Sequence, residues 1–216
     1  MAAPPPPKPP KPGKVKVFRA LYGYTAHQPD ELSFNEGDIL YILEDTVETT
    51  GWWQACCHGK SGLIPCNYVA EQAESISYPL HEAAKRGNME FLQDCLKNGV
   101  SVNSLDKSGS TALYWAAHSG HVDLLRVLLS YKGVNVLSQN KLGDSALHAA
   151  AWKGHREVVE LLLQSGADPS VKNGQHKSAF ELAKEPATAA ALKRVSGTPQ
   201  MLDAEEYENS DEDQSD

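Results

Sequence analysis

The sequence predicts a multidomain protein in which a small all-β module is followed by an all-α repeat solenoid, with a disordered segment at each end. Three observations support this prediction. From about residue 15 to 70, apolar residues alternate with polar ones between glycines. From residue 76 the chain repeats a short motif every 33 or 34 residues. Proline and lysine dominate the first fourteen residues, and the last sixteen contain eight acidic residues and no basic one.

Alternating apolar residues in the first module predict short strands that are half-buried. Turns between the strands are expected at Gly37, Gly51 and Gly59. A module of this size has a small core and is only marginally stable by itself. The apolar positions in the pattern are Val15, Val17, Ala20, Leu32, Phe34, Ile39, Tyr41, Ala55, Ile64 and Val69.

Four segments of this module stand in an order that is hard to obtain by chance. They are Ala-Leu-Tyr-Gly-Tyr at 20–24, Pro-Asp-Glu-Leu-Ser-Phe at 29–34, Trp-Trp at 52–53 and Gly-Leu-Ile-Pro-Cys-Asn-Tyr-Val at 62–69. With them, residues 15–71 resemble an SH3 domain, a five-stranded barrel that binds proline-rich peptides. Carried over position by position, the resemblance implies a peptide-binding role for Tyr22, Tyr24, Asp30, Glu31, Trp52, Pro65, Asn67 and Tyr68.

The chemistry of a proline-rich ligand explains these residue types. A polyproline II segment has no internal hydrogen bonds and little entropy left to lose, so flat aromatic walls and a donor such as Asn67 suit it. By the same resemblance Glu31, with Asp30 beside it, receives an Arg or Lys of the ligand. Exposed ion pairs contribute only about 0.2–1 kcal/mol each, so they mainly set orientation. The alternative that Tyr22 or Tyr68 is merely a core aromatic stays open.

The second module copies itself along the chain. Pro-Leu-His-x-Ala-Ala at 79–84 and its later copies resemble ankyrin repeats, which stack pairs of short helices into one elongated core. The last copy loses its second-helix pattern at Glu185-Pro186 and is interpreted as a cap. The anchor residues, at spacings of 33, 34 and 33, are Leu80, Leu113, Leu147 and Phe180. The expected units within 76–193 are 76–106, 107–140, 141–173 and a degenerate cap at 174–193.

Ankyrin repeats bind partners through positions that their own packing does not need, so the resemblance implies a second face that binds an unknown protein. Trp152 is its most informative member, because a polar residue is common at this position and a solvated Trp needs a reason. The alternative is that Trp152 packs on Trp115 of the neighbouring unit. The predicted partner face consists of Lys85, Arg86, Lys107, His118, Lys141, Trp152 and Lys153.

Both ends, 1–14 and 194–216, are expected to be disordered, and a short joint at 71–75 is expected to connect the two modules. Pro6 to Lys14 offers a polyproline II ligand to the SH3 domain of another protein, such as a Src-type tyrosine kinase; the alternative is a solvated extension. The acidic tail has too few apolar residues to order itself. In it, Tyr207 and Ser210 resemble phosphorylation sites.

Composition argues against several other classes of protein. The net charge of −8 belongs to the tail, because removing its eight acidic residues from the total of 28 leaves 20 to balance the 20 basic ones. No folded part is strongly basic, so nucleic-acid binding is not expected. No apolar run approaches about 18 residues and no signal-like start is present. We therefore expect a cytoplasmic protein without membrane insertion, and we expect a monomer.

Residue patterns for catalysis and metal binding are missing. The four cysteines show no framework spacing and are expected to be reduced thiols. Cys56-Cys57-His58 could suggest a metal, but neighbouring strand residues face opposite ways and no second ligand pair follows. His81 and His148 occupy one repeat position, and His121 and His155 occupy another. No metal, no cofactor and no enzymatic activity are therefore expected.

These parts predict a non-catalytic signalling adaptor that binds proline-rich proteins with Arg or Lys near the proline motif, and another protein through its repeats. Their order along the chain resembles one family of cytosolic adaptors, which implies an indirect link to osteoclast formation and bone resorption. The alternative is an autoinhibited regulatory subunit whose groove is occupied within the molecule. Affinities of about −8 kcal/mol for each partner suffice when an adaptor raises their effective concentration.

Overall fold

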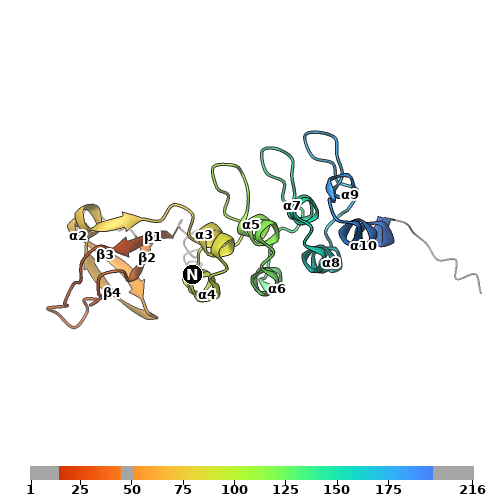
Figure 1. The fold of residues 1–216 in the computed structure, drawn as a ribbon. Coiled ribbons are helices and arrows are strands. Elements are labelled where there is room, and N and C mark those ends of the chain that lie inside the picture. The colour runs from red at the N-terminus through yellow and green to blue at the C-terminus, as the bar shows by residue number, and fades with distance from the viewer. Residues whose placement is uncertain (1–14, 45–50, 197–216) are drawn as a thin grey trace, which may run out of the picture.

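The chain is elongated, with a β-sheet at one end and a stack of helices at the other (Figure 1). The computed structural model describes residues 15–44 and 51–196. The predicted fold class, an all-β module followed by an all-α repeat solenoid, is confirmed. The expectations for residues 1–14, Tyr207 and Ser210 concern positions outside the described ranges.

The sheet has five antiparallel strands in the order β4-β3-β2-β1-β5. Its turns need glycine, since Gly37, Gly51 and Gly59 have φ values of 87°, 73° and 74°, which other residues rarely adopt. A short helix, α2 (Cys66–Gln72), lies between the last two strands. The strands are β1 (Lys16–Ala20), β2 (Ile39–Glu44), β3 (Trp52–Cys57), β4 (Lys60–Pro65) and β5 (Ala73–Ser75).

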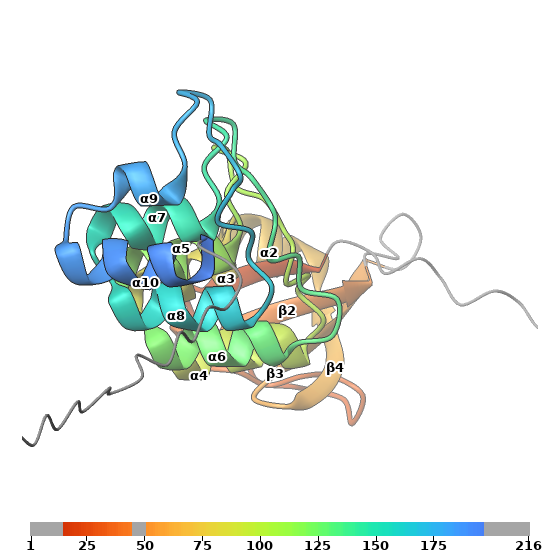
Figure 2. The same cartoon turned by 90° about the vertical axis from the view of Figure 1, so that its right-hand side faces the viewer.

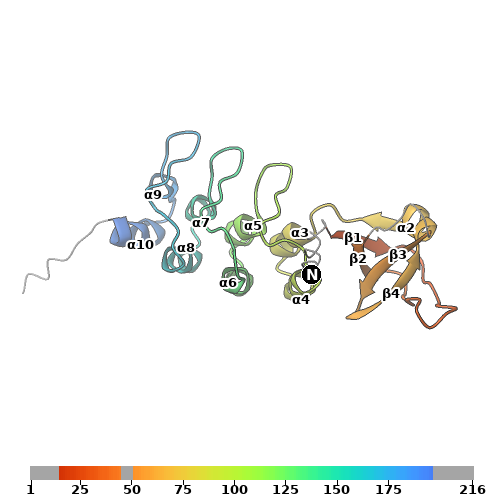
Figure 3. The same ribbon diagram turned by 180° about the vertical axis from the view of Figure 1, so that it is seen from behind.

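Strand β5 corrects the predicted boundary of the first module. It pairs with β1, so that Ala73 lies opposite Ala20 and Ser75 opposite Phe18. The expected joint at 71–75 is therefore wrong, because this segment ends α2 and forms the edge strand of the sheet. Only residues 76–78 separate β5 from the first helix of the stack, and Figure 3 shows this short passage from behind.

The sheet buries apolar side chains on both of its faces. Val17, Tyr41 and Cys56 lie opposite one another on three neighbouring strands, and they join the core of the helical stack. We call these three residues the shared row. Residues next to them in sequence, such as Leu40, point the other way into the core of the barrel. Burial, together with the nearby Cys95, raises the pKa of Tyr41, so its hydroxyl stays protonated.

The first repeat covers the shared row. Tyr41 is 3% exposed, and its hydroxyl oxygen lies 3.8 Å from Sγ of Cys95. The backbone N–H of Ile76 donates to the carbonyl of Val17 at 2.8 Å. Leu92 of the first repeat belongs to the same apolar cluster. The two modules therefore share one continuous core and do not hang on a flexible joint.

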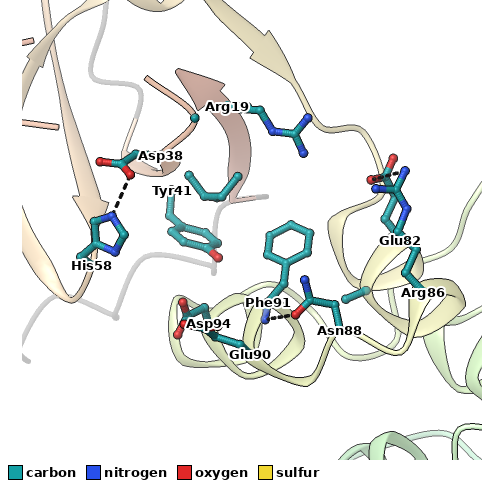
Figure 4. A pocket seen from close by; sticks show the side chains of 13 residues that line it. Arg19, Asp38, Tyr41, His58, Glu82, Arg86, Asn88, Glu90, Phe91 and Asp94 are labelled. Carbon is teal, nitrogen blue, oxygen red and sulfur yellow. Dashed lines mark hydrogen bonds and ion pairs between the residues drawn. The ribbon is translucent and has the colours of Figure 1, made fainter. Parts of the chain in front are cut away.

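A pocket of about 300 Å³ stays open beside this contact, between the sheet and the first repeat (Figure 4). Apolar side chains at its base include Tyr41 and Phe91. Its charged rim contains Arg86, whose guanidinium lies 3.9 Å from the carboxylate of Glu82. The pocket is thus lined partly by charged groups and lies beside the apolar contact between the two modules.

The helices form an inner and an outer row, and the loops before three inner helices protrude as fingers on one side (Figures 1 and 2). The inner helices are α3 (Pro79–Arg86), α5 (Ala112–Ser119), α7 (Ala146–Lys153) and α9 (Ala179–Leu182). The outer helices are α4 (Met89–Lys97), α6 (Val122–Ser130), α8 (Arg156–Gln164) and α10 (Pro186–Ser196).

Glycine and histidine lock the first repeat to the second and the second to the third, whereas Gly154 of the third repeat approaches Glu185 of the last. Helix α3 ends at Gly87 with φ of 72°, and a Cβ there would lie 2.8 Å from the ring of His121 in the next unit. That ring in turn places Nε2 3.3 Å from the carbonyl oxygen of Lys85. Gly120 and His155 repeat the arrangement. Glycine is needed here both for its left-handed backbone and for the close approach of the imidazole.

The last unit keeps a second helix, so its expected loss at Glu185-Pro186 is wrong. Helix α10 begins at Pro186 and runs to Ser196, with Leu192 fully buried. Proline is favourable at the first position of a helix, because its missing N–H has no partner there anyway. The helix also includes residues 194–196, which the sequence assigns to the disordered tail.

Replacing Tyr41 with Ala is expected to lower the free energy of unfolding by about 3 kcal/mol or more, because it removes a buried ring from the contact between the modules. Urea unfolding of the full chain measures this change. The control is Leu43→Ala on the same strand, where the side chain is 38% exposed and a smaller loss of about 1 kcal/mol is expected. Equal losses in the two variants would contradict a special role for the shared row.

Candidate functional site

The predicted peptide-binding residues meet on one surface of the sheet module. Trp52 at the start of β3 lies opposite Pro65 at the end of β4, and both are half-buried. The loop between β1 and β2 places Glu31 in a bridge with Leu63 of β4. Asn67 is exposed on α2, directly after this strand. Segments far apart in the sequence thus meet on one surface of the sheet module, which we call the groove after its predicted role.

The three tyrosines of the groove differ in exposure. Tyr22 is 62% exposed, and Tyr24 is half-buried with its ring centroid 6.2 Å from that of Tyr68. Tyr68 is only 8% exposed and belongs to the core of the barrel, where its hydroxyl donates to the backbone carbonyl of Tyr22. Tyr68 is therefore mainly a core aromatic residue, as the alternative interpretation expected. The ring of Tyr22 is exposed to solvent.

Glu31 has a second task that the sequence does not reveal. Its Oε2 accepts a hydrogen bond from the Tyr24 hydroxyl at 2.8 Å and another from the backbone N–H of His27 at 2.7 Å. The N–H of His27 and the Tyr24 hydroxyl hold the pKa of Glu31 below its ordinary value, although partial desolvation opposes them. A carboxylate has about four acceptor positions, so capacity for a ligand cation remains. Asp30 beside it is exposed.

The groove lies away from the helical stack. In the described part of the chain, none of its residues belongs to the shared row or lines the pocket between the modules. A second cavity at the junction, of about 790 Å³, is also lined by other residues. The contact that joins the modules therefore leaves the aromatic groove accessible.

A second surface runs across three inner helices. Nζ of Lys85 lies 3.7 Å from the ring centroid of Trp115. The ring of Trp115 is 5.5 Å from His118, and His118 is 5.9 Å from Trp152. Two more lysines each place Nζ 4.5 Å from the Trp152 ring. We call this array the ladder, and it consists of Lys85, Trp115, His118, Trp152, Lys153 and Lys184.

The middle of the ladder, His118, is held in its neutral form. Partial burial and the nearby Lys153, His155 and Lys85 hold the pKa of His118 below its ordinary value. A neutral imidazole lies between the two indoles without adding charge, at 70° to the Trp115 ring and at 34° to the Trp152 ring. The indole N–H of Trp115 donates to the Asp106 carboxylate at 2.8 Å, which fixes the orientation of that ring.

The ladder contains part of the predicted partner face and adds residues to it. Arg86 instead lines the pocket between the modules, and Lys107 and Lys141 lie in the turns of two fingers. Trp115 and Lys184 were not predicted. Direct packing of Trp152 on Trp115 is not found, since His118 lies between them and Trp152 is 42% exposed. Trp115 stands three residues before His118, a helical spacing that could have placed both on one face.

Cys56-Cys57-His58 was considered as a metal site in the sequence. In the structure, a different set of residues brings possible ligand atoms together. Cys56 and Cys57 point to opposite faces of the sheet, whereas Asp38, Cys57 and His58 have ligand atoms within 4.8 Å of one another. Burial, followed by the charge of Asp38, raises the pKa of Cys57 to about 12, so the thiol is a poor ligand. Nε2 of His58 lies 2.9 Å from Oδ1 of Asp38.

Comparison with known families agrees with both modules. A model of the SH3 domain matches residues 19–66, and a model of ankyrin repeats in three copies matches residues 80–173. Within the described ranges, no helix has the length and apolar character needed to cross a bilayer. The chain is thus a non-catalytic protein-interaction protein that combines a proline-peptide-binding module with a repeat module.

Similar proteins show a more specific relationship. Osteoclast-stimulating factor 1 of Bos taurus is 56% identical over 206 residues, which cover 94% of this chain and 95% of the relative. The proteins of the same name from Gallus gallus and Danio rerio are 60% and 57% identical, and the matches cover 88% and 89% of this chain and 93% and 89% of the relatives. The chain belongs to the osteoclast-stimulating factor 1 family.

Replacing Trp52 with Ala is expected to weaken the binding of an Arg-containing proline-rich peptide by about tenfold or more, because central aromatic residues carry most of the energy of such contacts. Isothermal titration with the full chain measures the affinity. Trp152→Ala is the matched control, since it removes an indole from the other module and should leave this affinity unchanged. A similar loss in both variants would contradict the assignment of the groove.

Proposed function

We propose that this protein is a cytosolic signalling adaptor that brings two other proteins together. The groove binds a proline-rich ligand with an Arg or Lys beside its proline motif, and the ladder binds a second protein. As a member of the osteoclast-stimulating factor 1 family, the chain promotes osteoclast formation and bone resorption indirectly, through the proteins that it joins.

The observation that carries this proposal is that one continuous core joins the two modules that carry the candidate surfaces. The shared row fixes the sheet on the first repeat, and the groove and the ladder each keep large exposed rings, Tyr22 and Trp152. Exposed aromatic side chains of this kind are characteristic of binding surfaces. A fixed distance between the two surfaces raises the effective concentration of one bound protein for the other.

The ends of the chain extend the proposal. The segment from Pro6 to Lys14 offers a polyproline II ligand to the SH3 domain of a further protein, of which a Src-type tyrosine kinase is an example. Tyr207 and Ser210 are proposed as phosphorylation sites. The alternative is a regulatory subunit whose groove is blocked within the molecule. It has no specific support, because no described segment covers Tyr22, whose side chain is 62% exposed.

A bridging experiment tests the adaptor. A resin that carries an Arg-containing proline-rich peptide is expected to capture the full chain together with a second protein from a lysate of osteoclast precursors. Trp52→Ala should abolish capture of both, whereas Trp152→Ala should retain the chain and lose the second protein. Leu137→Ala, at a position that is 55% exposed and lies outside both surfaces, should behave like the unchanged chain. Loss of the second protein only with Trp52→Ala would contradict a bridging role of the ladder.

A further inference from the structure

The ladder combines an exposed ring with cations that have no acidic partner in the described part of the chain. Trp152 is 42% exposed, and Lys153 and Lys184 each lie 4.5 Å from its ring. A third lysine, Lys85, lies over Trp115 at the other end of the array. Because His118 between the indoles is held neutral, the surface has a cationic group at each end and an aromatic centre.

This arrangement fits a ligand of opposite charge that carries one aromatic side chain. Carboxylates satisfy lysine ammonium groups, and a phenol ring can lie against an indole. The ammonium groups need not leave the Trp faces, since each has three donors and can contact a ring and a carboxylate together. The ladder therefore selects an acidic segment with a tyrosine or phenylalanine in it.

The same chain contains such a segment beyond α10. Residues 201–216 carry eight acidic and no basic side chains. In Glu205-Glu206-Tyr207-Glu208 a single aromatic residue stands between glutamates. Of the charged stretches in the sequence, this is the one that matches a ring flanked by lysines.

The length of chain between α10 and this segment permits contact with the ladder. Helix α10 ends at Ser196, and the nine steps to Glu205 span up to roughly 30 Å when extended. Helix α10 packs on α9 and α9 packs on α7, which carries Trp152. Two spacings between packed helices of about 8–10 Å each lie within this reach.

We propose that residues 201–216 bind the ladder of their own chain in the free protein, with Tyr207 against Trp152 and the glutamates beside Lys153 and Lys184. The inference rests on the proposed function only in treating the ladder as a binding surface. An intramolecular ligand has a high effective concentration, so weak individual contacts suffice. A second protein then has to displace this segment, and it needs either higher affinity or a change in the charge of the tail.

Signals of the four tryptophan indoles provide the first test. Nuclear magnetic resonance spectra of the full chain are compared with those of a chain that ends at Gln200. We expect the indole N–H signal of Trp152 to shift between the two, and the signals of Trp52 and Trp53 to remain as internal references. The shift should decrease as sodium chloride rises from 20 to 500 mM, because exposed charges are screened. It should not depend on protein concentration.

A peptide with the sequence of residues 201–216 provides the second test. Added to the chain that ends at Gln200, it should shift the Trp152 signal in the direction seen in the full chain. Lys153→Glu together with Lys184→Glu should weaken its binding by about tenfold or more, since two attractions become repulsions. Lys60→Glu with Lys97→Glu makes the same change of charge at exposed positions elsewhere and should have little effect. A peptide with Glu205→Lys and Glu206→Lys should bind the reversed ladder and so restore the interaction.

Several outcomes would overturn the inference. Identical Trp152 signals with and without the tail would exclude the contact, and a shift that grows with concentration would assign it to a second copy of the chain. Peptide binding that the ladder charges do not affect would place the tail elsewhere. If the double charge reversal unfolds the protein, Lys153→Gln with Lys184→Gln must still lower the affinity for the peptide. None of these readouts uses a second protein, so the adaptor function can fail or hold independently.

Discussion

The contact between the outer face of the sheet and the first repeat is the constraint on which the rest of the structure depends. Val17, Tyr41 and Cys56 would lie in water if the sheet module stood alone, because they point away from its own core. The first repeat covers them, and in turn the sheet covers Cys95 and its neighbours at the open end of the stack. A solenoid needs a cap at each end. Here the sheet module is the cap at the N-terminal end.

This arrangement determines which surfaces remain for binding. The face that carries the shared row is covered by the first repeat and cannot bind a peptide. The aromatic groove lies elsewhere on the sheet module. In the stack, the core-forming faces of the inner helices are used for packing, and the side chains of the ladder are those left at the surface. Because one core joins the modules, the distance between groove and ladder is set by the fold. The proposed adaptor function therefore implies a fixed spacing between its two ligands.

Sequence reasoning was most successful where a motif fixes several residues together. The SH3 module followed from four segments in order, and the repeats from anchors such as Leu80 and Leu113, because local chemistry determines both. It failed where a contact joins distant segments. Ala73–Ser75 is too short to show a period, and it is a strand only because β1 offers an edge. Ile39 to Leu43 is apolar without interruption, which indicates a strand buried on both faces, but no pattern says what covers the second face.

The ladder shows the same limit at the level of single residues. Positions taken from the ankyrin family gave Lys85, His118, Trp152 and Lys153 correctly as neighbours, but they also gave Lys107 and Lys141, which belong to the fingers. Family positions describe where any repeat can bind, whereas the chemistry of this face comes from what one unit places beside the next. His118 is informative for this reason. Burial and the nearby Lys85 and Lys153 disfavour a protonated imidazole, so the lysines proposed to attract an acidic ligand also help to keep the ring between the indoles neutral.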